Sequence, residues 1–340
     1  MFETVNVPCQ VCGGDQSQEL FTLDFRAYRY PWPFVLRRCG GCGLLFNSPR
    51  LDAEGIRNLY GAGYYVFHQP ARPEIRRTLA AYQRTVRLLE HPSGDLLEIG
   101  SAKGFMLALL RELGWRVRGV EISPQASSFA RRRFGLDVYT GTIEQFVRQN
   151  GGRYDAVLAQ DVLEHVSDPI SFFRCLRPCL RPGGWLILDT PNGGARNIER
   201  VGPRWRGFNP FHVFLFSAAC LRQIAEDHGF RVHRIASYNN VPPEESVTGR
   251  KKQLAAAKQV SAGPDSRRVR ALLGPIAATL SRVGDSLLLS HYLHRAARKS
   301  RACAPAELHD DCAGDNLICL AQAPPERDRR PGTAALTAPG

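Results

Sequence analysis

The 340-residue chain carries a formal net charge of +13 at pH 7, with hydrophobic residues making up 44% of its length. This length allows one large core and a second small module, and the chain has no run of about 18 apolar residues that would predict a membrane-spanning helix. The N-terminal residues lack the basic-then-apolar pattern of a signal peptide, so we expect a cytoplasmic protein. The basic excess gathers in residues 246–340, which hold 15 basic and 8 acidic residues. Nearly all basic residues are arginine, which is typical of a codon bias, so arginine richness is weak evidence for nucleic-acid binding and we expect no nucleic-acid partner.

Two Cys-x-x-Cys-Gly motifs lie near the N-terminus and are separated by 26 residues. Thiolates two residues apart on a tight turn converge on one tetrahedral ion, and a hairpin over Glu19–Leu36 would bring the two motifs together. Disulfides are disfavoured in the cytosol. The spacing predicts a structural zinc ribbon over residues 1–50, with redox-active dithiols as the alternative. The predicted metal ligands are Cys9, Cys12, Cys39 and Cys42.

The pattern of residues 51–92 predicts a helical linker. Apolar residues at helical period predict helices over Ala53–Tyr60 and Pro73–Leu89. Between them, residues 61–68 combine glycines with large aromatic rings. We interpret this loop either as a lid over a bound ligand or as packing between the ribbon and the core.

A strand, a small-residue turn and a helix follow at residues 95–113. The apolar run Leu96–Ile99 predicts a buried strand, Gly100–Gly104 a tight turn, and Phe105 the start of a helix. Such a turn lets the backbone approach a nucleotide-like ligand closely, with helix N–H groups directed at it. A dinucleotide-binding fingerprint requires a glycine where Phe105 stands, which argues against hydride chemistry.

An acidic residue follows the next predicted strand. Arg116–Val120 ends at Glu121, about twenty residues after the turn, where a doubly wound fold places a carboxylate on ribose hydroxyls. The pattern Glu98-x-Gly100-x-Ala102-x-Gly104 resembles the first motif of the class I S-adenosylmethionine-dependent methyltransferases, with alanine in place of the middle glycine. Three later stretches resemble further motifs of that family in the same order, namely Thr140–Phe146, Tyr154–Pro169 and Leu180–Asn192.

The N-terminal stretch resembles a second known module. The segments CQVCGG, RRCGGCGLLFNSPR and LYGAGYY are similar to the zinc-binding module that precedes the methyltransferase core in many bacterial enzymes acting on sugars and natural products. Together, the two resemblances imply an α/β protein with a Rossmann-like, seven-stranded doubly wound sheet whose last strand is antiparallel. The implied segments are a core over residues 93–241, a helical insertion over 242–315, the last strand over 316–323 and a disordered tail over 324–340.

The resemblance also implies a cofactor, S-adenosylmethionine, and a set of binding residues. Because ligands of such sheets bind at the carboxyl ends of the strands, the set gathers at those ends. Its members are Glu98, Gly100, Ser101, Ala102, Gly104, Glu121, Ile122, Thr142, Ile143, Asp161 and Val162.

Methyl transfer requires alignment of donor and acceptor and, for a hydroxyl acceptor, removal of one proton. His165 and His212 follow the fourth and fifth predicted strands, so we predict them as catalytic residues. Glu164 is an alternative base, and a bracing role for the histidines stays open. The basic, aromatic segment 191–216 is interpreted as an acceptor-binding loop.

These observations predict transfer of a methyl group to a small-molecule, sugar or lipid-linked acceptor, with O-methylation favoured. The alternatives are an RNA methyltransferase that grips RNA with the ribbon and the basic C-terminal region, and a non-catalytic zinc-bearing partner protein. The amphipathic segment 269–300 is consistent with peripheral membrane contact, a dimer contact or packing on the core. The sequence predicts no oligomeric state.

Overall fold

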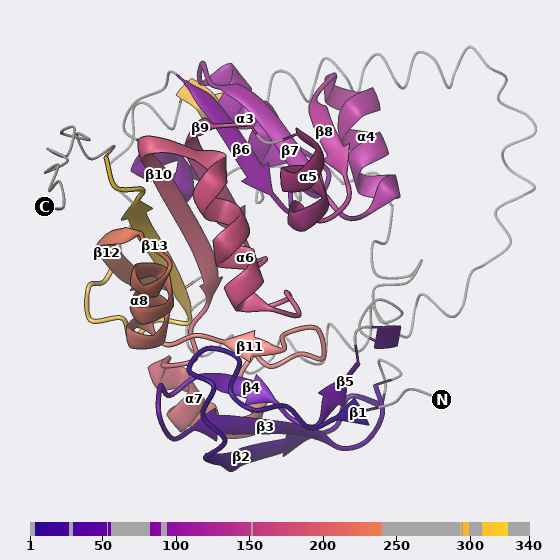
Figure 1. Ribbon diagram of the computed structural model, residues 1–340, viewed down its shortest axis with the longest axis vertical. Coiled ribbons are helices and arrows are strands. Elements are labelled where there is room, and N and C mark those ends of the chain that lie inside the picture. Colours follow the sequence, from indigo (N-terminus) through magenta and orange to yellow (C-terminus); the bar gives the residue numbers. More distant parts are fainter. Residues whose placement is uncertain are drawn as a thin grey trace, which may run out of the picture.

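A seven-stranded sheet organises the larger part of the protein (Figure 1). The structure, a computed structural model, describes residues 4–26, 30–52, 54–55, 82–89, 94–150, 152–239, 293, 295–298 and 308–325. The strand order is β12-β13-β10-β9-β6-β7-β8. In chain order the strands are β6 (Asp95–Ile99), β7 (Arg116–Glu121), β8 (Asp137–Thr140), β9 (Tyr154–Gln160), β10 (Leu180–Pro191), β12 (Arg231–Tyr238) and β13 (Asn316–Gln322).

The sheet is parallel except for β13. Strand β6 pairs in parallel with both β7 and β9, whereas β13 is antiparallel to its two neighbours, β10 and β12. The central strands are buried on both faces, as expected for a parallel sheet covered by helices. The predicted fold class, including the antiparallel last strand close to residues 316–323, is confirmed.

Six described helices connect these strands. They are α3 (Phe105–Glu112), α4 (Pro124–Phe134), α5 (Ile143–Asn150), α6 (Pro169–Leu176), α7 (Arg196–Val201) and α8 (Ala218–Asp227). The side chains of Ser123, Asp168 and Ser217 each cap a helix by accepting a backbone N–H of its first turn. A proline follows two of these caps at the first helical position, where its missing backbone N–H costs no helical hydrogen bond. Local sequence therefore determines where several helices begin.

The N-terminal module contributes most strands of a second, smaller sheet. Strands β2 (Ser17–Leu23) and β3 (Phe34–Cys39) make the predicted hairpin, and β4 (Leu45–Asn47) extends it. A short two-stranded sheet joins β1 (Thr4–Val5) to β5 (Arg50–Leu51). The sheet that contains β2, β3 and β4 has a fourth strand, β11 (Phe214–Leu215), which comes from the core and pairs with β4 (Figure 1). The module and the core therefore share a sheet, which the sequence did not predict.

The segment 191–216, interpreted from sequence as an acceptor-binding loop, also packs against the N-terminal module. Trp205 is fully buried, and its indole N–H donates to Asp315 at 2.7 Å. Its ring packs edge-on against Phe208 in a cluster that includes Leu23 and Phe34 of the N-terminal module. Apolar packing on the module explains the aromatic content of this segment, which we had attributed to ligand binding.

Several predicted features lie largely outside the described residues. They are the helix over 53–60, the loop over 61–68, most of the insertion over 242–315 and the tail from residue 326. Residues 82–88 are helical, in agreement with the predicted helix over Pro73–Leu89. Within 269–300, the described residues Leu293, Ala296 and Ala297 are buried in a core cluster. Among the helices that the structure describes, none has the length and apolar character needed to cross a membrane.

Candidate active site and cysteine cluster

The turn after β6 has the backbone of a ligand-binding loop. Gly100 and Gly104 have φ values of 72° and 77°, in the left-handed region that favours glycine. A Cβ atom on Gly100 would collide with Val162, and one on Gly104 would lie 2.8 Å from Ala130 and Leu136. Ala102, at the position of the missing glycine, adopts the same left-handed region with a φ of 45°. The loop therefore keeps its geometry despite this substitution.

Glu121 fixes the loop against the neighbouring strand. One of its carboxylate oxygens accepts the backbone N–H of Ala102 and the other that of Ser123, each at 2.7 Å. The residue is only 1% exposed. A carboxylate oxygen can accept more than one hydrogen bond, so this arrangement is compatible with the predicted contact to ribose hydroxyls. The structure thus gives Glu121 a positioning role that the sequence did not predict, beside the predicted binding role.

Glu98 lies beneath the loop and is 5% exposed. Burial, together with the nearby charge of Glu121, raises the pKa of Glu98 to about 8. Among the described residues, its Oε2 atom has no hydrogen-bond partner. A buried carboxyl oxygen without a partner suits a cationic group of a ligand.

Replacing Glu98 with glutamine should stabilise the ligand-free protein at pH 8. The unfolded Glu98 loses its proton near pH 4.5, whereas the folded one keeps it to about pH 8, so the wild-type free energy of unfolding falls as pH rises across this window. Glutamine does not titrate. Between pH 5 and pH 8 the variant should gain roughly 2 to 4 kcal/mol relative to wild type, measured by urea denaturation. Identical pH dependence in both proteins would contradict the buried, protonated state of Glu98.

The other predicted binding residues gather at the carboxyl ends of adjacent strands. Ile122 follows β7 and is exposed, Thr142 and Ile143 follow β8, and Asp161 and Val162 follow β9. Asp161 has a left-handed φ of 50°, and burial raises its pKa to about 6.

One residue near this site was not singled out from sequence. Tyr82 lies in the helical stretch 82–88. Burial is the main cause that raises the pKa of its hydroxyl, and the nearby charges of Glu98 and Asp161 raise it further. The apolar period of that stretch identified Tyr82 only as a packing residue. Its position depends on how the linker folds back over the strand ends.

Glu164, His165 and His212 form one compact group, called here the Glu-His-His cluster. Glu164 is fully buried, and its Oε1 atom lies 3.6 Å from Nε2 of His165 and 3.9 Å from Nε2 of His212. The two imidazole rings are 4.8 Å apart between centroids. The structure therefore brings together the two predicted catalytic histidines and the alternative base, although 47 positions separate the histidines in the sequence.

Backbone contacts set the position of this cluster. The carbonyl oxygen of Glu164 accepts the backbone N–H of Val213 at 2.9 Å, and Val213 directly precedes β11. The side chain of Glu164 accepts the hydroxyl of Thr190, at the end of β10, at 2.9 Å. Neither Val213 nor Thr190 was identified from sequence, because the contacts join segments that are distant in the chain.

Both histidines are neutral in this setting. Burial lowers the pKa of His165 to about 4 and that of His212 to about 3. Burial also raises the pKa of Glu164, and the charges of Asp161 and Asp189 raise it further. The cluster therefore presents imidazole lone pairs at neutral pH, which can accept a proton or bind an electrophilic group.

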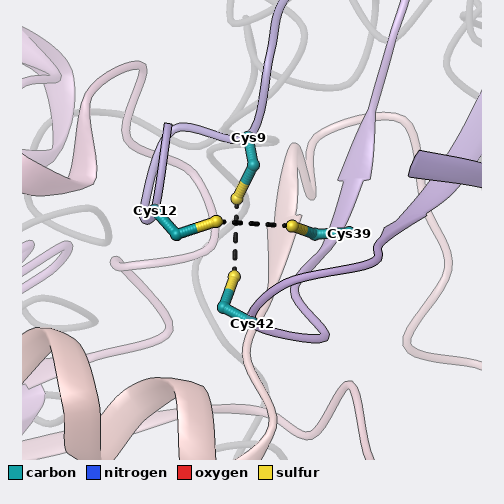
Figure 2. A group of neighbouring side chains, drawn as sticks. All are labelled: Cys9, Cys12, Cys39 and Cys42. Carbon is teal, nitrogen blue, oxygen red and sulfur yellow. Dashed lines mark hydrogen bonds between the residues drawn. The ribbon is translucent and has the colours of Figure 1, made fainter. Parts of the chain in front are cut away.

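The four N-terminal cysteines converge on one point (Figure 2). The sulfur atoms of Cys9 and Cys42 are 3.5 Å apart, and those of Cys12 and Cys39 are 3.4 Å apart. All four sulfur atoms lie within 4.8 Å of one another. In each motif the backbone N–H of the glycine donates to the carbonyl oxygen of the first cysteine, and this hydrogen bond closes the tight turn.

Burial raises the pKa of Cys42 to about 12. At Cys39 it is outweighed by backbone hydrogen bonds, which lower the pKa to about 7.

Residues 71–235 match a family model described as a methyltransferase domain. By this match, the stretch that holds the loop after β6 and Glu164 is a methyltransferase domain. Its motifs, its strand order and the residues at the strand ends agree with that assignment.

Two relatives carry the name ubiquinone biosynthesis O-methyltransferase. The one from Xanthomonas campestris pv. campestris (strain B100) is 29% identical over 128 residues, covering 33% of this chain and 54% of that protein. The one from Cereibacter sphaeroides (strain ATCC 17029 / ATH 2.4.9) is 32% identical over 116 residues, covering 32% and 47%. The chain thus spans about half the length of the curated relatives it matches. A solved S-adenosylmethionine-dependent methyltransferase from Archaeoglobus fulgidus gives a TM-score of 0.47 at 15% identity, covering 76% of this chain and 99% of that one.

Proposed function

We propose that this protein transfers a methyl group from S-adenosylmethionine to a hydroxyl oxygen of a small-molecule, sugar or lipid-linked acceptor. The observation that carries the proposal is the adjacency of two sites. Val162 contacts the glycine loop at Gly100, and three residues later His165 enters the Glu-His-His cluster. A cofactor loop and a group of imidazole lone pairs thus meet at the end of β9.

The residues of the loop suit the cofactor. Glu121, at the end of β7, is placed to accept ribose hydroxyls, and the buried Oε2 of Glu98 suits the α-ammonium group. The left-handed loop at Gly100 and Ala102 keeps side chains away from the ligand. When bound, S-adenosylmethionine supplies a methyl group already activated on a sulfonium.

The remaining chemistry belongs to the Glu-His-His cluster. A hydroxyl is a poor nucleophile until its proton leaves, and a neutral imidazole nitrogen beside it can accept that proton as the new bond forms. The names of the relatives support an oxygen acceptor. The comparisons favour neither an RNA methyltransferase nor a non-catalytic partner protein.

The cysteine cluster is proposed to hold a structural zinc ion. Four sulfur donors within 4.8 Å of one another suit the tetrahedral coordination that zinc adopts in closed sites. Held by four protein ligands, this ion would have no open position for substrate, so its role would be to stabilise the N-terminal module.

The proposal is tested by incubating the protein with S-adenosylmethionine and one of three acceptors: catechol, phenol or methyl glucoside. Formation of S-adenosylhomocysteine together with a methyl ether, identified by mass spectrometry, is the expected result. A product methylated on carbon would contradict O-methylation. Calorimetric titration with S-adenosylhomocysteine tests the cofactor site separately, and absence of binding would overturn the enzymatic proposal.

Replacing His165 with glutamine should lower kcat by ~100- to 10,000-fold, the usual contribution of a proton-transfer group. Affinity for S-adenosylhomocysteine should change by less than about threefold, since His165 is not among the residues that form the loop. The matched control is His233→Gln, an exposed histidine on β12, which should retain wild-type kinetics. A His165→Gln variant as active as that control would exclude the cluster from the reaction.

A further inference from the structure

The loop over residues 207–212 is fixed at both ends. At its start, Trp205 and Phe208 pack edge-on against each other within an apolar cluster of the N-terminal module. Its end leads into β11, which pairs with β4 of that module. Gly207 fits beside Trp205 only because it has no side chain, since a Cβ atom there would lie 2.1 Å from the indole ring. The backbone groups of this loop are therefore held at set positions in the Glu-His-His cluster.

The side-chain amide of Asn209 has one possible orientation in this loop. One of its two polar atoms lies 2.9 Å from the backbone N–H of Phe211 and 3.2 Å from that of His212. Because a backbone N–H can only donate, the atom that both groups face is the amide oxygen Oδ1. The amide nitrogen Nδ2 is then the atom that lies 2.9 Å from Nε2 of His212, to which it donates.

Both ring nitrogens of His212 are thereby committed to the protein. Nδ1 lies 2.7 Å from the carbonyl oxygen of Gly207, which can only accept, so Nδ1 carries the ring proton. Nε2 accepts from Asn209, and a second ring proton on Nε2 would point at this amide donor. His212 is therefore poorly suited to take the proton of a bound hydroxyl.

The neighbours of His212 do not favour a second proton either. Burial lowers its pKa to about 3, and the charge of His165 lowers it further. Among the described residues, the titratable groups that face it are His165, at 4.8 Å between ring centroids, and Glu164, whose Oε1 lies 3.9 Å from Nε2. Burial, and then the charge of Asp161, raise the pKa of Glu164, which favours its uncharged, protonated form.

The same loop sets the tautomer of His165. Nδ1 of His165 lies 3.0 Å from the carbonyl oxygen of Phe211, so Nδ1 carries the proton of the neutral ring and Nε2 is its basic nitrogen. Phe211 is also the residue whose N–H donates to Oδ1 of Asn209. One asparagine side chain thus closes the turn that presents a carbonyl oxygen to His165 and saturates the second nitrogen of His212.

We propose that Asn209 is a positioning residue, which holds His212 neutral with its proton on Nδ1 and keeps the Phe211 carbonyl on His165. His165 is then the base, and His212 supports it without taking a proton. This division of roles rests on the proposed function. Nε2 of His165 takes the hydroxyl proton as the O–CH₃ bond forms and the S–CH₃ bond of the cofactor breaks, leaving the methyl ether, S-adenosylhomocysteine and a protonated His165.

The test is Asn209→Asp in the full-length protein, with histidine ¹⁵N-labelled for nuclear magnetic resonance. Aspartate keeps the turn, because its Oδ1 can accept the same two backbone N–H groups. Its second oxygen carries no amide proton, so a proton must lie between this oxygen and Nε2 of His212. Wild type should show an unprotonated Nε2 at neutral pH, and the variant an Nε2 signal shifted toward that of a protonated nitrogen. Signals missing from His212→Gln identify the residue.

Asn239→Asp is the matched control. Oδ1 of Asn239 also accepts a backbone N–H, that of Asp315 at 2.9 Å, and the residue is exposed outside the cluster. This control should keep the wild-type histidine signals and rate. In Asn209→Asp, kcat should fall by at least ~10-fold, while affinity for S-adenosylhomocysteine changes by less than about threefold.

A merely structural role of Asn209 predicts wild-type histidine signals or wild-type kcat in Asn209→Asp, and either result would overturn the proposal. A protonated Nε2 on His212 in wild type would also overturn it, and this measurement needs no variant to fold. The spectra require no acceptor, which separates this proposal from the proposed function. The expected signals in a protein that methylates no acceptor would support the fixed tautomer and count against the proposed function alone.

Discussion

Glu121→Gln should weaken binding of S-adenosylhomocysteine by ~100-fold or more, since loss of about 3 kcal/mol of charge-assisted hydrogen bonding corresponds to that factor. Both carboxylate oxygens are used by the protein itself, through the backbone N–H groups of Ala102 and Ser123. The amide of glutamine would direct an N–H group at one of these donors. The loop would then lose its fixed position, and the ribose its acceptor.

Calorimetric titration measures this change. Glu199→Gln is the matched control, because Glu199 is exposed on α7, away from the strand ends, and its replacement should leave affinity unchanged. The free energy of unfolding of Glu121→Gln should also fall, because a buried donor loses its acceptor. Wild-type affinity in Glu121→Gln would mean that the carboxylate serves the loop alone and does not contact the ligand.

Cys39→Ser should abolish binding of the proposed zinc ion and unfold the N-terminal module. Structural zinc sites contribute of the order of 10 kcal/mol in small zinc-finger peptides, so the module has little stability without its ion. We expect the zinc content to drop from about one ion per chain to less than a tenth, and residues 1–50 to become sensitive to limited proteolysis. Atomic absorption and proteolysis measure the two effects.

Cys39→Ser should also lower the rate of methyl transfer. The module's strand β4 pairs with β11, and Val213, directly before β11, donates to the carbonyl of Glu164. Loss of the module releases His212, one residue earlier, and misplacement of a catalytic group by about 1 Å costs ~100-fold in rate. Cys175→Ser, which changes a half-buried cysteine outside the cluster, should preserve both zinc content and rate. Full methyl transfer by a zinc-free Cys39→Ser protein would contradict this coupling.

Local patterns were sufficient for much of the architecture. The apolar run of β6, the turn from Gly100 to Gly104 and the caps at Ser123 and Asp168 each act over a few residues, so they can be recognised without knowing the fold. The position of β13 was also predicted, because the methyltransferase resemblance implies an antiparallel last strand and residues 316–321 hold an apolar run that can form it. In segment 191–216, Trp205 packs inward, while acceptor binding by the rest of that segment stays a prediction.

The sequence by itself determined the loop that ends at Gly104, the place of Glu121 and the convergence of four cysteines, because residue type and spacing decide these features locally. The fold class followed from the resemblance of several motifs, in order, to the methyltransferase family. Only the tertiary structure decided that β11 completes the sheet of the N-terminal module and that Glu164, His165 and His212 meet. The physical reason is that both depend on contacts between segments far apart in the chain. Burial and backbone partners then set the tautomers of the two histidines, and no sequence pattern records those partners.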